Sequence, residues 1–217
     1  LFNGVTGKII KDSTITIDPT STNIRWKNSL GTSLFSPSCS SAQSNCFFGV
    51  SAGQGFDGTV ATATGNTAVG FLALSSTASA NMIGNVAFGA DVLENCIGPG
   101  RYNASIGTNS MKNLTTGNSN TSLGSQSLFD ILTGSRNTAI GYDAGRNYTS
   151  SETNNILIGY NVLGTVGESS VIRIGDSQTS TFIKGIHNVT PAGATETVII
   201  DSNGELGSTS AISGDVV

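Results

Sequence analysis

Few side chains in this sequence could carry out catalysis. His187 is the only histidine among the 217 residues, which excludes metal sites that need two histidines. A serine–histidine–aspartate arrangement is compatible with the composition, but no Gly-x-Ser-x-Gly turn precedes a predicted helix. The 14 acidic residues are dispersed, and no pair has a spacing that assigns acid and base roles. We therefore expect a protein that is not an enzyme and that needs no metal and no cofactor.

The segment 201–205, with the sequence DSNGE, contains part of the pattern of a calcium-binding loop. The remaining ligands of such a loop are missing, and Asn203-Gly204 is a strong signal for a hairpin turn. A plain turn is the preferred interpretation of this segment. His187 lies between two predicted strands, where a structural role is preferred to a functional one.

Binding chemistry is better represented, because four basic side chains recur at related positions. Lys112 and Arg146 each lie five residues after a glycine of the repeat described below, and Arg101 and Arg136 precede its asparagines. We expect residues at the same phase of stacked coils to lie on one face, where they would bind sulfated or otherwise anionic glycans through charge-assisted hydrogen bonds. In the alternative interpretation, which the acidic chain favours, they are separate solvated charges balanced by Glu94, Asp130 and Asp143.

Aromatic side chains are further candidates, because they can stack on sugars. The repeat carries insertions near residues 53–65 and 94–102, and insertions in repeat proteins often map to a binding face. Packing of the aromatic rings between coils or between chains is the preferred alternative. The residues concerned are Phe56, Tyr102, Tyr142 and Tyr148.

The composition indicates an all-β protein rich in turns. Charged residues make up only 11% and hydrophobic residues 37%, while 28 residues are glycine. Uncharged polar residues combined with glycine and β-branched residues suit turn-rich β structure. The net charge of −4 argues against nucleic acid or an anionic membrane as a partner. No run of about 20 apolar residues is present, so we expect no direct insertion into a membrane.

Three cysteines bear on the cellular compartment. Cys39 and Cys46 are close enough in sequence to close a small disulfide loop, which would indicate an oxidising compartment. Cys96 would then remain, either as a buried thiol, which is the preferred interpretation, or in contact with a symmetry partner.

One five-residue pattern, Asn-x-x-(bulky apolar)-Gly, recurs seven times and organises the chain. Its glycines are successively 21, 19, 18, 17, 17 and 18 residues apart. Each unit is too small to bury a core alone, whereas stacked coils share one core, as in solenoid proteins. The asparagines are Asn45, Asn66, Asn85, Asn103, Asn120, Asn137 and Asn155, and the glycines are Gly49, Gly70, Gly89, Gly107, Gly124, Gly141 and Gly159.

A second apolar residue usually follows four positions after each glycine, with Gly145 as an exception. No segment offers a helical apolar stripe free of glycine, which argues against a helical repeat. The glycines should adopt positive φ, and the asparagines should do the same or cap turns, while their stacked side chains form a hydrogen-bonded ladder. The second apolar residues are Leu74, Leu93, Met111, Leu128 and Leu163.

The alternation of side chains along a strand decides which residues face the core. We expect the bulky residue before each glycine to point into the coil. The small residue before it should face outward, where a row of small side chains would let a second copy of the chain approach closely. The bulky residues are Phe48, Val69, Phe88, Ile106, Leu123, Ile140 and Ile158, and the small ones include Ala68, Ala87, Ser105, Ser122 and Ala139.

Stretches such as GNTAVGFLAL, LTTGNSNTSLGSQSL and GSRNTAIGYDAG resemble the head repeats of trimeric autotransporter adhesins and the repeats of phage and giant-virus fibres. The resemblance covers about residues 44–165. It implies a left-handed parallel β-roll that assembles as an intertwined homotrimer, in an extracellular location at a cell surface or on a virion or tail fibre. The repeats here are longer than those typical of adhesin heads, which puts any specific adhesin ligand in doubt.

The flanks give the chain a three-part organisation: an N-terminal junction over residues 1–37, the roll over 38–165 and a C-terminal hairpin region over 166–217. Residues 14–17 alternate as in a strand. Residues 171–186 and 198–207 are each predicted to form a hairpin, the second around Asn203-Gly204.

The expected function is attachment. A trimeric fibre or adhesin head would bind a host or environmental surface through a glycan or a protein receptor. The alternative is a structural spacer or trimerisation segment of a fibre, with recognition elsewhere, and an enzymatic tailspike is a distant third. Binding of glycans or cells by the isolated chain would separate the first two possibilities.

Overall fold

A computed structural model of the chain describes residues 44–56, 63–75 and 81–181 in full, together with the backbone of six flanking strands. The chain forms two compact units, Leu1–Ser177 and Gln178–Val217. The first begins with three antiparallel strands, which pair in the order β1 (Ser13–Ile17), β2 (Ile24–Asn28) and β3 (Ser33–Phe35). The strand predicted around Ile15 is thereby confirmed.

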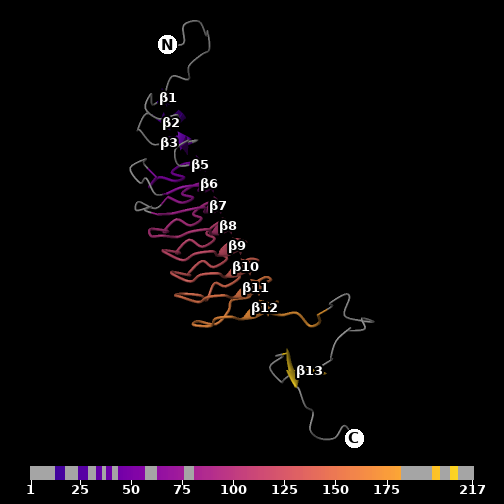
Figure 1. Cartoon of the computed structure of the whole chain (residues 1–217). Helices are drawn as coiled ribbons and strands as arrows, with labels where there is room; N and C mark the ends of the chain where they lie inside the picture. Colours follow the sequence, from indigo (N-terminus) through magenta and orange to yellow (C-terminus); the bar gives the residue numbers. More distant parts are fainter. Residues whose placement is uncertain are drawn as a thin grey trace, which may run out of the picture. The chain divides into compact units, whose positions relative to one another are not determined.

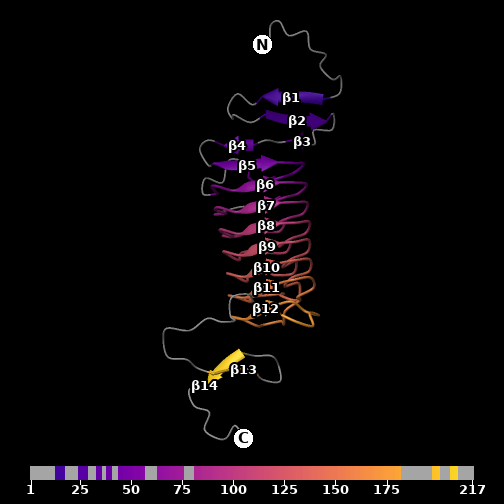
Figure 2. The ribbon, with the colours of Figure 1, turned by 90° about the vertical axis from the view of Figure 1, so that its right-hand side faces the viewer.

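The repeats form a parallel β-solenoid in which each repeat contributes one coil and one short strand. Eight strands stack in chain order, each paired in parallel with the next, and Figures 1 and 2 show them as successive rungs of one sheet. None of the fully described residues is helical. The strands are β5 (Asn45–Phe48), β6 (Thr67–Val69), β7 (Val86–Phe88), β8 (Ala104–Ile106), β9 (Thr121–Leu123), β10 (Thr138–Ile140), β11 (Ile156–Ile158) and β12 (Ile172–Ile174).

The asparagines of the repeat form a continuous ladder inside the solenoid. The side-chain amide of Asn120 donates to Oδ1 of Asn103 at 3.1 Å and to the carbonyl of Gly134 at 2.8 Å. Its own Oδ1 accepts the backbone N–H of Asn137 at 3.0 Å and the side-chain amide of that residue at 3.1 Å. The same links join every neighbouring pair from Asn45 to Asn155. Of the two roles expected for asparagine, bonding through the side chain is the one observed.

The repeat glycines adopt positive φ as expected, and the close stacking of the coils adds a second requirement. The φ of Gly124 is 145°, in a region that residues with a Cβ rarely occupy. A Cβ placed there would also overlap the carbonyl group of Gly141 in the next coil. Glycine is therefore needed both for the backbone angle and for the approach of the next coil.

The predicted orientation of the strand side chains is wrong. The small residues face the core, since Ala68, Ala87 and Ala139 are fully buried, and Ser105 and Ser122 are at most 1% exposed. Each bulky residue directly follows the buried one in its strand, so it faces outward. Phe88 is 55% exposed and Leu123 is 46% exposed. Because side chains alternate with a period of two, an error of one residue in phase reverses every position.

The interior is narrow, and this explains why small strand residues are needed. The apolar residue four positions after the glycine fills it from the opposite wall, and Leu74, Leu93, Met111 and Leu128 are all fully buried. The hydroxyl of Ser105 bonds the carbonyl of Ser110 at 3.1 Å, directly across this interior. At Gly145, where the pattern breaks, a Cβ would collide with Leu128.

Two boundaries differ from the prediction. The solenoid continues beyond residue 165, because β12 pairs in parallel with β11, with Ile156 opposite Ile172. The hairpin predicted over residues 171–186 is therefore wrong in its first half, and residues 182–186 lie outside the described part of the chain. At the other end, β4 (Ser38–Ser40) pairs antiparallel with β5 and covers the first edge of the sheet.

The second unit contains the predicted C-terminal hairpin. Strand β13 (Thr197–Ile200) pairs antiparallel with β14 (Leu206–Thr209), with Val198 opposite Ser208. The intervening residues, which include Asn203-Gly204, lie outside the described part, as does His187.

Candidate functional site

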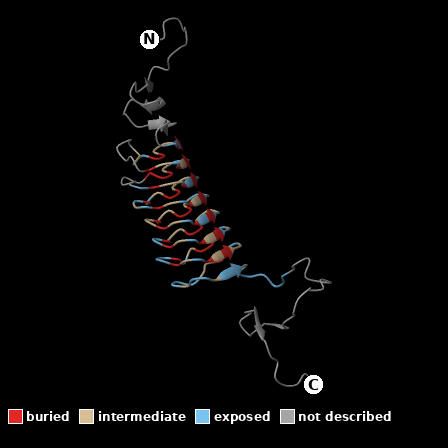
Figure 3. Ribbon diagram, in the orientation of Figure 1, coloured by how far each residue is buried: buried red, intermediate tan, exposed pale blue. Residues whose placement is uncertain are grey.

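An apolar stripe runs along the outer face of the solenoid sheet. It consists of the outward residue at the end of each strand, and the register stacks these residues directly, with Ile106 opposite Leu123 and Leu123 opposite Ile140. Exposure reaches 72% at Ile174. Figure 3 shows the strands alternating between buried and exposed positions, whereas β12 is exposed throughout. The apolar stripe comprises Phe48, Val69, Phe88, Ile106, Leu123, Ile140, Ile158 and Ile174.

A second column of outward side chains lies at the first position of the same strands. It adds apolar residues to the outer face in β7, β11 and β12. Val86 is exposed in β7, Ile172 is exposed in β12, and Ile156 is half-buried in β11. The middle of that column is smaller and more polar, with Ala104, Thr121 and Thr138. The face is thus widest in apolar surface near β11 and β12.

Lys112 and Arg146 lie in the common column expected from their phase, with Phe129 between them. Backbone hydrogen bonds link this column from coil to coil, as from Asn113 N–H to the carbonyl of Phe129 at 3.2 Å. The guanidinium carbon of Arg146 lies 5.6 Å from the centre of the Phe129 ring, within the range of a cation–π contact.

Both cations in this column are balanced by nearby acids. Nζ of Lys112 lies 2.9 Å from a carboxylate oxygen of Glu94 and 3.8 Å from one of Asp91. The hydrogen bond that Lys112 donates to Glu94 is the main cause that raises the pKa of Lys112. Arg146 contacts Asp143 at 3.1 Å and donates to Gln126 at 2.7 Å. For this pair the alternative of locally balanced charges is the better description.

Arg101 and Arg136 lie on a different edge, in the turns that lead into the strands. Neither side chain forms an ion pair with any residue in the described part of the chain. Arg101 lines a shallow, open pocket of about 380 Å³, together with Tyr102, Pro99, Asn118 and Ser119. Arg136 occupies the position of Tyr102 two coils further along the stack, as the successive bonds from Ser119 N–H to Arg101 O and from Arg136 N–H to Asn118 O show.

The four aromatic candidates divide between structural and exposed positions. Tyr148 is fully buried, and Phe56 packs against the core with its ring 4.8 Å from that of Phe47. Tyr102 is exposed, and so is Tyr142, which stacks on Tyr160 with ring centres 5.6 Å apart. Sequence reasoning missed Tyr160, although it follows Gly159 just as Tyr142 follows Gly141.

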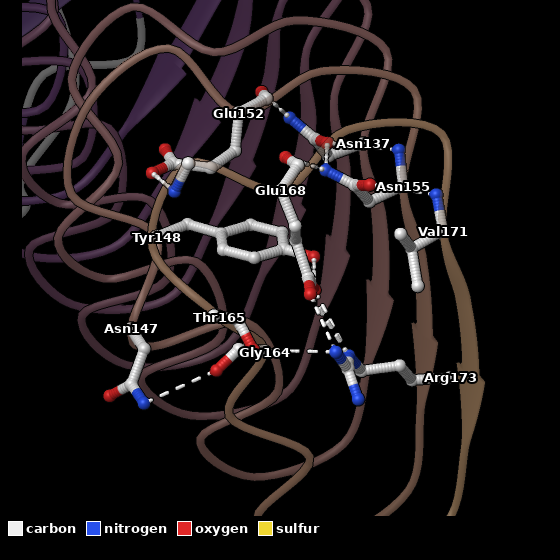
Figure 4. A network of polar contacts seen from close by, with 11 residues as sticks. Asn137, Asn147, Tyr148, Glu152, Asn155, Gly164, Thr165, Glu168, Val171 and Arg173 are labelled. Atoms are coloured by element: carbon white, nitrogen blue, oxygen red, sulfur yellow. Dashed lines mark hydrogen bonds and ion pairs between the residues drawn. The ribbon is translucent and has the colours of Figure 1, made fainter. Parts of the chain in front are cut away.

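A polar network closes the C-terminal end of the solenoid (Figure 4). The buried ring of Tyr148 places its hydroxyl 2.5 Å from a carboxylate oxygen of Glu168. Glu168 also accepts hydrogen bonds from Arg173 of β12, the shortest at 2.6 Å. Arg173 pairs with Leu157 in the sheet. It therefore occupies the strand position at which the earlier strands carry a small or apolar residue that faces the core. We name Tyr148, Glu168 and Arg173 the end network. The repeat pattern does not predict this network, because Glu168 and Arg173 lie after the last repeat.

The ionisation of the end network follows from these contacts. The hydrogen bonds from Arg173 are the main cause that lowers the pKa of Glu168 to about 2, and the bond from Tyr148 acts in the same direction. Burial, followed by the bond to Glu168, raises the pKa of Tyr148. A neighbouring acid, Glu152, is buried, which by itself would raise its pKa, but the N–H groups of Gly167 and Ser150 hold the pKa below its usual value. These two glutamates are therefore ionised structural groups at neutral pH.

The thiol of Cys96 is buried and is not poised for reaction. Cys96 is fully buried, burial raises its pKa to about 12, and its Sγ lies 3.6 Å from the carbonyl of Thr115. The expectation of a buried thiol is confirmed. Cys39 and Cys46 stand opposite each other in the pairing of β4 with β5. The side chain of Cys39 lies outside the described part of the chain, so their disulfide stays a prediction.

No group of three or more His, Cys, Asp or Glu residues suited to hold a metal ion occurs within residues 44–56, 63–75 and 81–181. The calcium-loop fragment at 201–205 lies outside these ranges. Over the same described residues, no helix is long and apolar enough to cross a bilayer.

Comparison with known proteins returns no match, either with the models of protein families, with curated proteins or with solved structures.

Proposed function

We propose that the chain is the head of a trimeric extracellular fibre or adhesin, which attaches to a host or environmental surface and is not an enzyme. In this proposal each copy is a left-handed β-roll, and three copies pack about a common axis, as the resemblance of the repeats to adhesin and fibre heads implies. The observation that carries the proposal is the apolar stripe. Contiguous apolar surface of this kind on a protein in water typically marks an interface.

The geometry of the apolar stripe favours copies of the same chain as its partner. Each stripe residue stacks on its equivalent in the next strand, so the stripe runs along the direction in which the coils stack. A parallel copy that is rotated about an axis in this direction would make the same type of contact at every coil, which is the condition for closed symmetry. Its aromatic and branched aliphatic side chains, such as Phe88 and Ile106, suit a permanent interface.

In this proposal the bulky residues form the contact with a second copy, a contact that the sequence pattern had assigned to the small residues. The row of Ala and Ser residues lies inside the coil and is not available to a second copy. Copies that meet through the apolar stripe would bury large side chains instead, which contributes about 25 cal/mol for each Å² of apolar surface removed from water.

Light scattering of the isolated chain tests the assembly, and binding to glycan arrays and to cells tests the attachment. We expect a stable species with a mass near three times 22.1 kDa, independent of dilution. A monomer at all concentrations would contradict the trimer and with it the fibre-head function.

A structural spacer is the second candidate, and one observation favours it. The asparagine side chains of the repeat are bonded within the solenoid, since those from Asn45 to Asn155 bond to one another and to the backbone. The repeat itself therefore offers no ligand contact from these residues. A trimer that binds neither glycans nor cells would be assigned as a spacer.

A further inference from the structure

The pocket beside Arg101 differs from the other polar surface of the solenoid in its charge balance. Lys112 and Arg146 are each paired with an acid, whereas Arg101 and Arg136 form no ion pair within the described residues. In the next two coils, the turns that lead into the strands carry Asn118, Ser119 and Ser135 beside this pocket, and these residues are uncharged. Glu152, at the following coil of the same edge, is buried and accepts backbone N–H groups. The pocket therefore has a net positive charge on a chain that is acidic overall.

The guanidinium of Arg101 is not saturated by its own chain. Its Nε is buried and has no hydrogen-bond acceptor among the described residues. A buried donor without an acceptor is uncommon in proteins and costs more when it carries charge. Arg101 is held at this edge by its backbone, whose N–H donates to Oδ1 of Asn118 at 2.9 Å. Arg101 thus lines the pocket, and no hydrogen bond or ion pair within the described residues satisfies its guanidinium.

Tyr102 supplies an aromatic surface next to this charge. Tyr102 as a residue is 62% exposed, yet its ring lies against the previous coil. A Cβ on Gly84 would come within 2.9 Å of Cδ1 of Tyr102, so the absence of a side chain at residue 84 gives the ring its place. The backbone of Tyr102 has a φ of 57°. A tyrosine held against the backbone in this way loses less freedom when a ligand stacks on it than a mobile side chain would lose.

The size of the pocket favours a small molecule, or one unit of a polymer, over a protein as the ligand. A volume of about 380 Å³ lies within the range of pockets for small molecules, which is about 300–1,000 Å³. A protein partner needs a surface of about 800 Å² on each side, and the pocket does not provide it. The combination of a cation, an exposed ring and amide or hydroxyl groups matches one monosaccharide unit that bears an acidic group.

We propose that this pocket binds an acidic saccharide, in which a sulfate or carboxylate group contacts Arg101 and the apolar face of a sugar ring lies on Tyr102. Asn118 and Ser119 offer hydrogen bonds to sugar hydroxyls. Arg136, two coils further on, attracts a second acidic sugar unit of the same saccharide. This proposal rests on the proposed attachment function, for which it names the ligand class and the site. Lys112 and Arg146 belong to no part of the site.

The test uses the full chain and three probes, measured by titration calorimetry: a heparin octasaccharide, a hyaluronan octasaccharide and maltoheptaose. They represent sulfated, carboxylated and neutral saccharides. We expect binding of at least one acidic probe and none of maltoheptaose. Binding of hyaluronan would show that a carboxylate suffices, whereas binding of heparin alone would show that sulfate groups are needed. Arg101→Gln should weaken this binding by about tenfold or more, as for the loss of a charge-assisted hydrogen bond. The control Lys112→Gln removes one positive charge as well and should change the affinity less than about twofold.

A second variant separates the site from general attraction of charge. Tyr102→Asn removes the ring but keeps a residue that tolerates positive φ, and it should weaken binding of the same probe with no change in net charge. Equal losses in Arg101→Gln and Lys112→Gln, or no binding of either acidic probe, would overturn the proposal. Trimers of Arg101→Gln that attach to cells as well as the unmodified chain would also overturn it while leaving the attachment function in place. A monomeric chain that attaches to nothing would instead remove the attachment function itself.

Discussion

At the scale of single residues, the repeat is explained by contacts between identical positions in neighbouring coils. Each asparagine between Asn45 and Asn155 bonds to the asparagines before and after it, and each glycine leaves room for the glycine of the next coil. A residue of the pattern therefore has to satisfy its own coil and two neighbours. This restricts its chemistry more than burial alone would.

A pair of glycine variants separates the two reasons for glycine at these positions, which are the positive φ of the backbone and the close contact with the next coil. Gly124 has a φ of 145° and is in close contact with Gly141, whereas Gly167 has a φ of 81° with no atom near the place of a Cβ. We expect Gly167→Ala to lower the free energy of unfolding by about 1 kcal/mol through backbone strain. Gly124→Ala adds a steric clash to this strain and should cost about 3 kcal/mol or more.

Urea unfolding at one fixed chain concentration measures both variants. Equal losses for Gly124→Ala and Gly167→Ala would show that strain alone accounts for the effect and that the coils can move apart to admit a methyl group.

At the scale of elements, the two ends of the solenoid are closed in different ways. β4 covers the first edge by antiparallel pairing with β5. At the other end, β12 carries Arg173 at the inward position, where earlier strands carry Phe, Ala, Ser or Leu. A charged inward residue on an edge strand discourages the addition of a further strand, and the end network satisfies that charge.

The end network should make the stability of the solenoid depend on pH. The pKa of Glu168 is lowered from 4.5 to about 2 in the folded chain. A carboxylate with a depressed pKa stabilises the fold fully above its unfolded pKa, and this contribution is lost as the pH falls through the folded pKa. The difference in thermal midpoint between the unmodified chain and Glu168→Gln should therefore be largest near pH 7 and shrink between about pH 4.5 and pH 2.

Thermal unfolding followed by circular dichroism from pH 7 to pH 2 makes this measurement. Asp130→Asn serves as a control, because Asp130 lies outside the end network and accepts one bond from Asn113 at 3.2 Å. A midpoint difference for Glu168→Gln that stays constant down to pH 2 would contradict the role given to this carboxylate.

At the scale of the whole molecule, the solenoid presents surfaces of different character along the direction of its stack. The sheet carries the apolar stripe, and the turns that lead into the strands carry the pocket of Arg101 and Tyr102. In the proposed trimer the first surface would be covered by other copies. The second would be repeated three times, which increases the avidity for a surface with many copies of one glycan.

Two matched variants test whether the apolar stripe holds the copies together. Leu123, in the stripe, is 46% exposed, and Leu132, in a turn outside the sheet, is 42% exposed. In an isolated chain the two positions are nearly equivalent. Leu123→Asp would bury a charge in the proposed interface and should reduce the mass in light scattering to that of a monomer, while Leu132→Asp should leave the trimer intact. Retention of the trimer in Leu123→Asp would exclude the stripe as the interface.

The sequence by itself determined the repeat, its length, the parallel stacking of coils and the asparagine ladder. These features depend on contacts between equivalent positions, and a period in the sequence reveals such positions directly. The strand around Ile15 and the C-terminal hairpin were also predictable, because each follows from local alternation or from the Asn203-Gly204 signal.

Only the tertiary structure decided which face of each strand is inside. Alternation is symmetric, so the sequence shows that Ala139 and Ile140 face opposite ways but not which one faces the core. The space inside each coil decides it: where residues such as Leu128 fill the interior, the inward strand residue is Ala or Ser, whereas the larger Phe47 faces the interior beside Gly53, which has no side chain. The charge balance of Lys112 and the open position of Arg101 likewise depend on partners 18 and 17 residues away, Glu94 and Asn118, and become visible only when the coils are stacked.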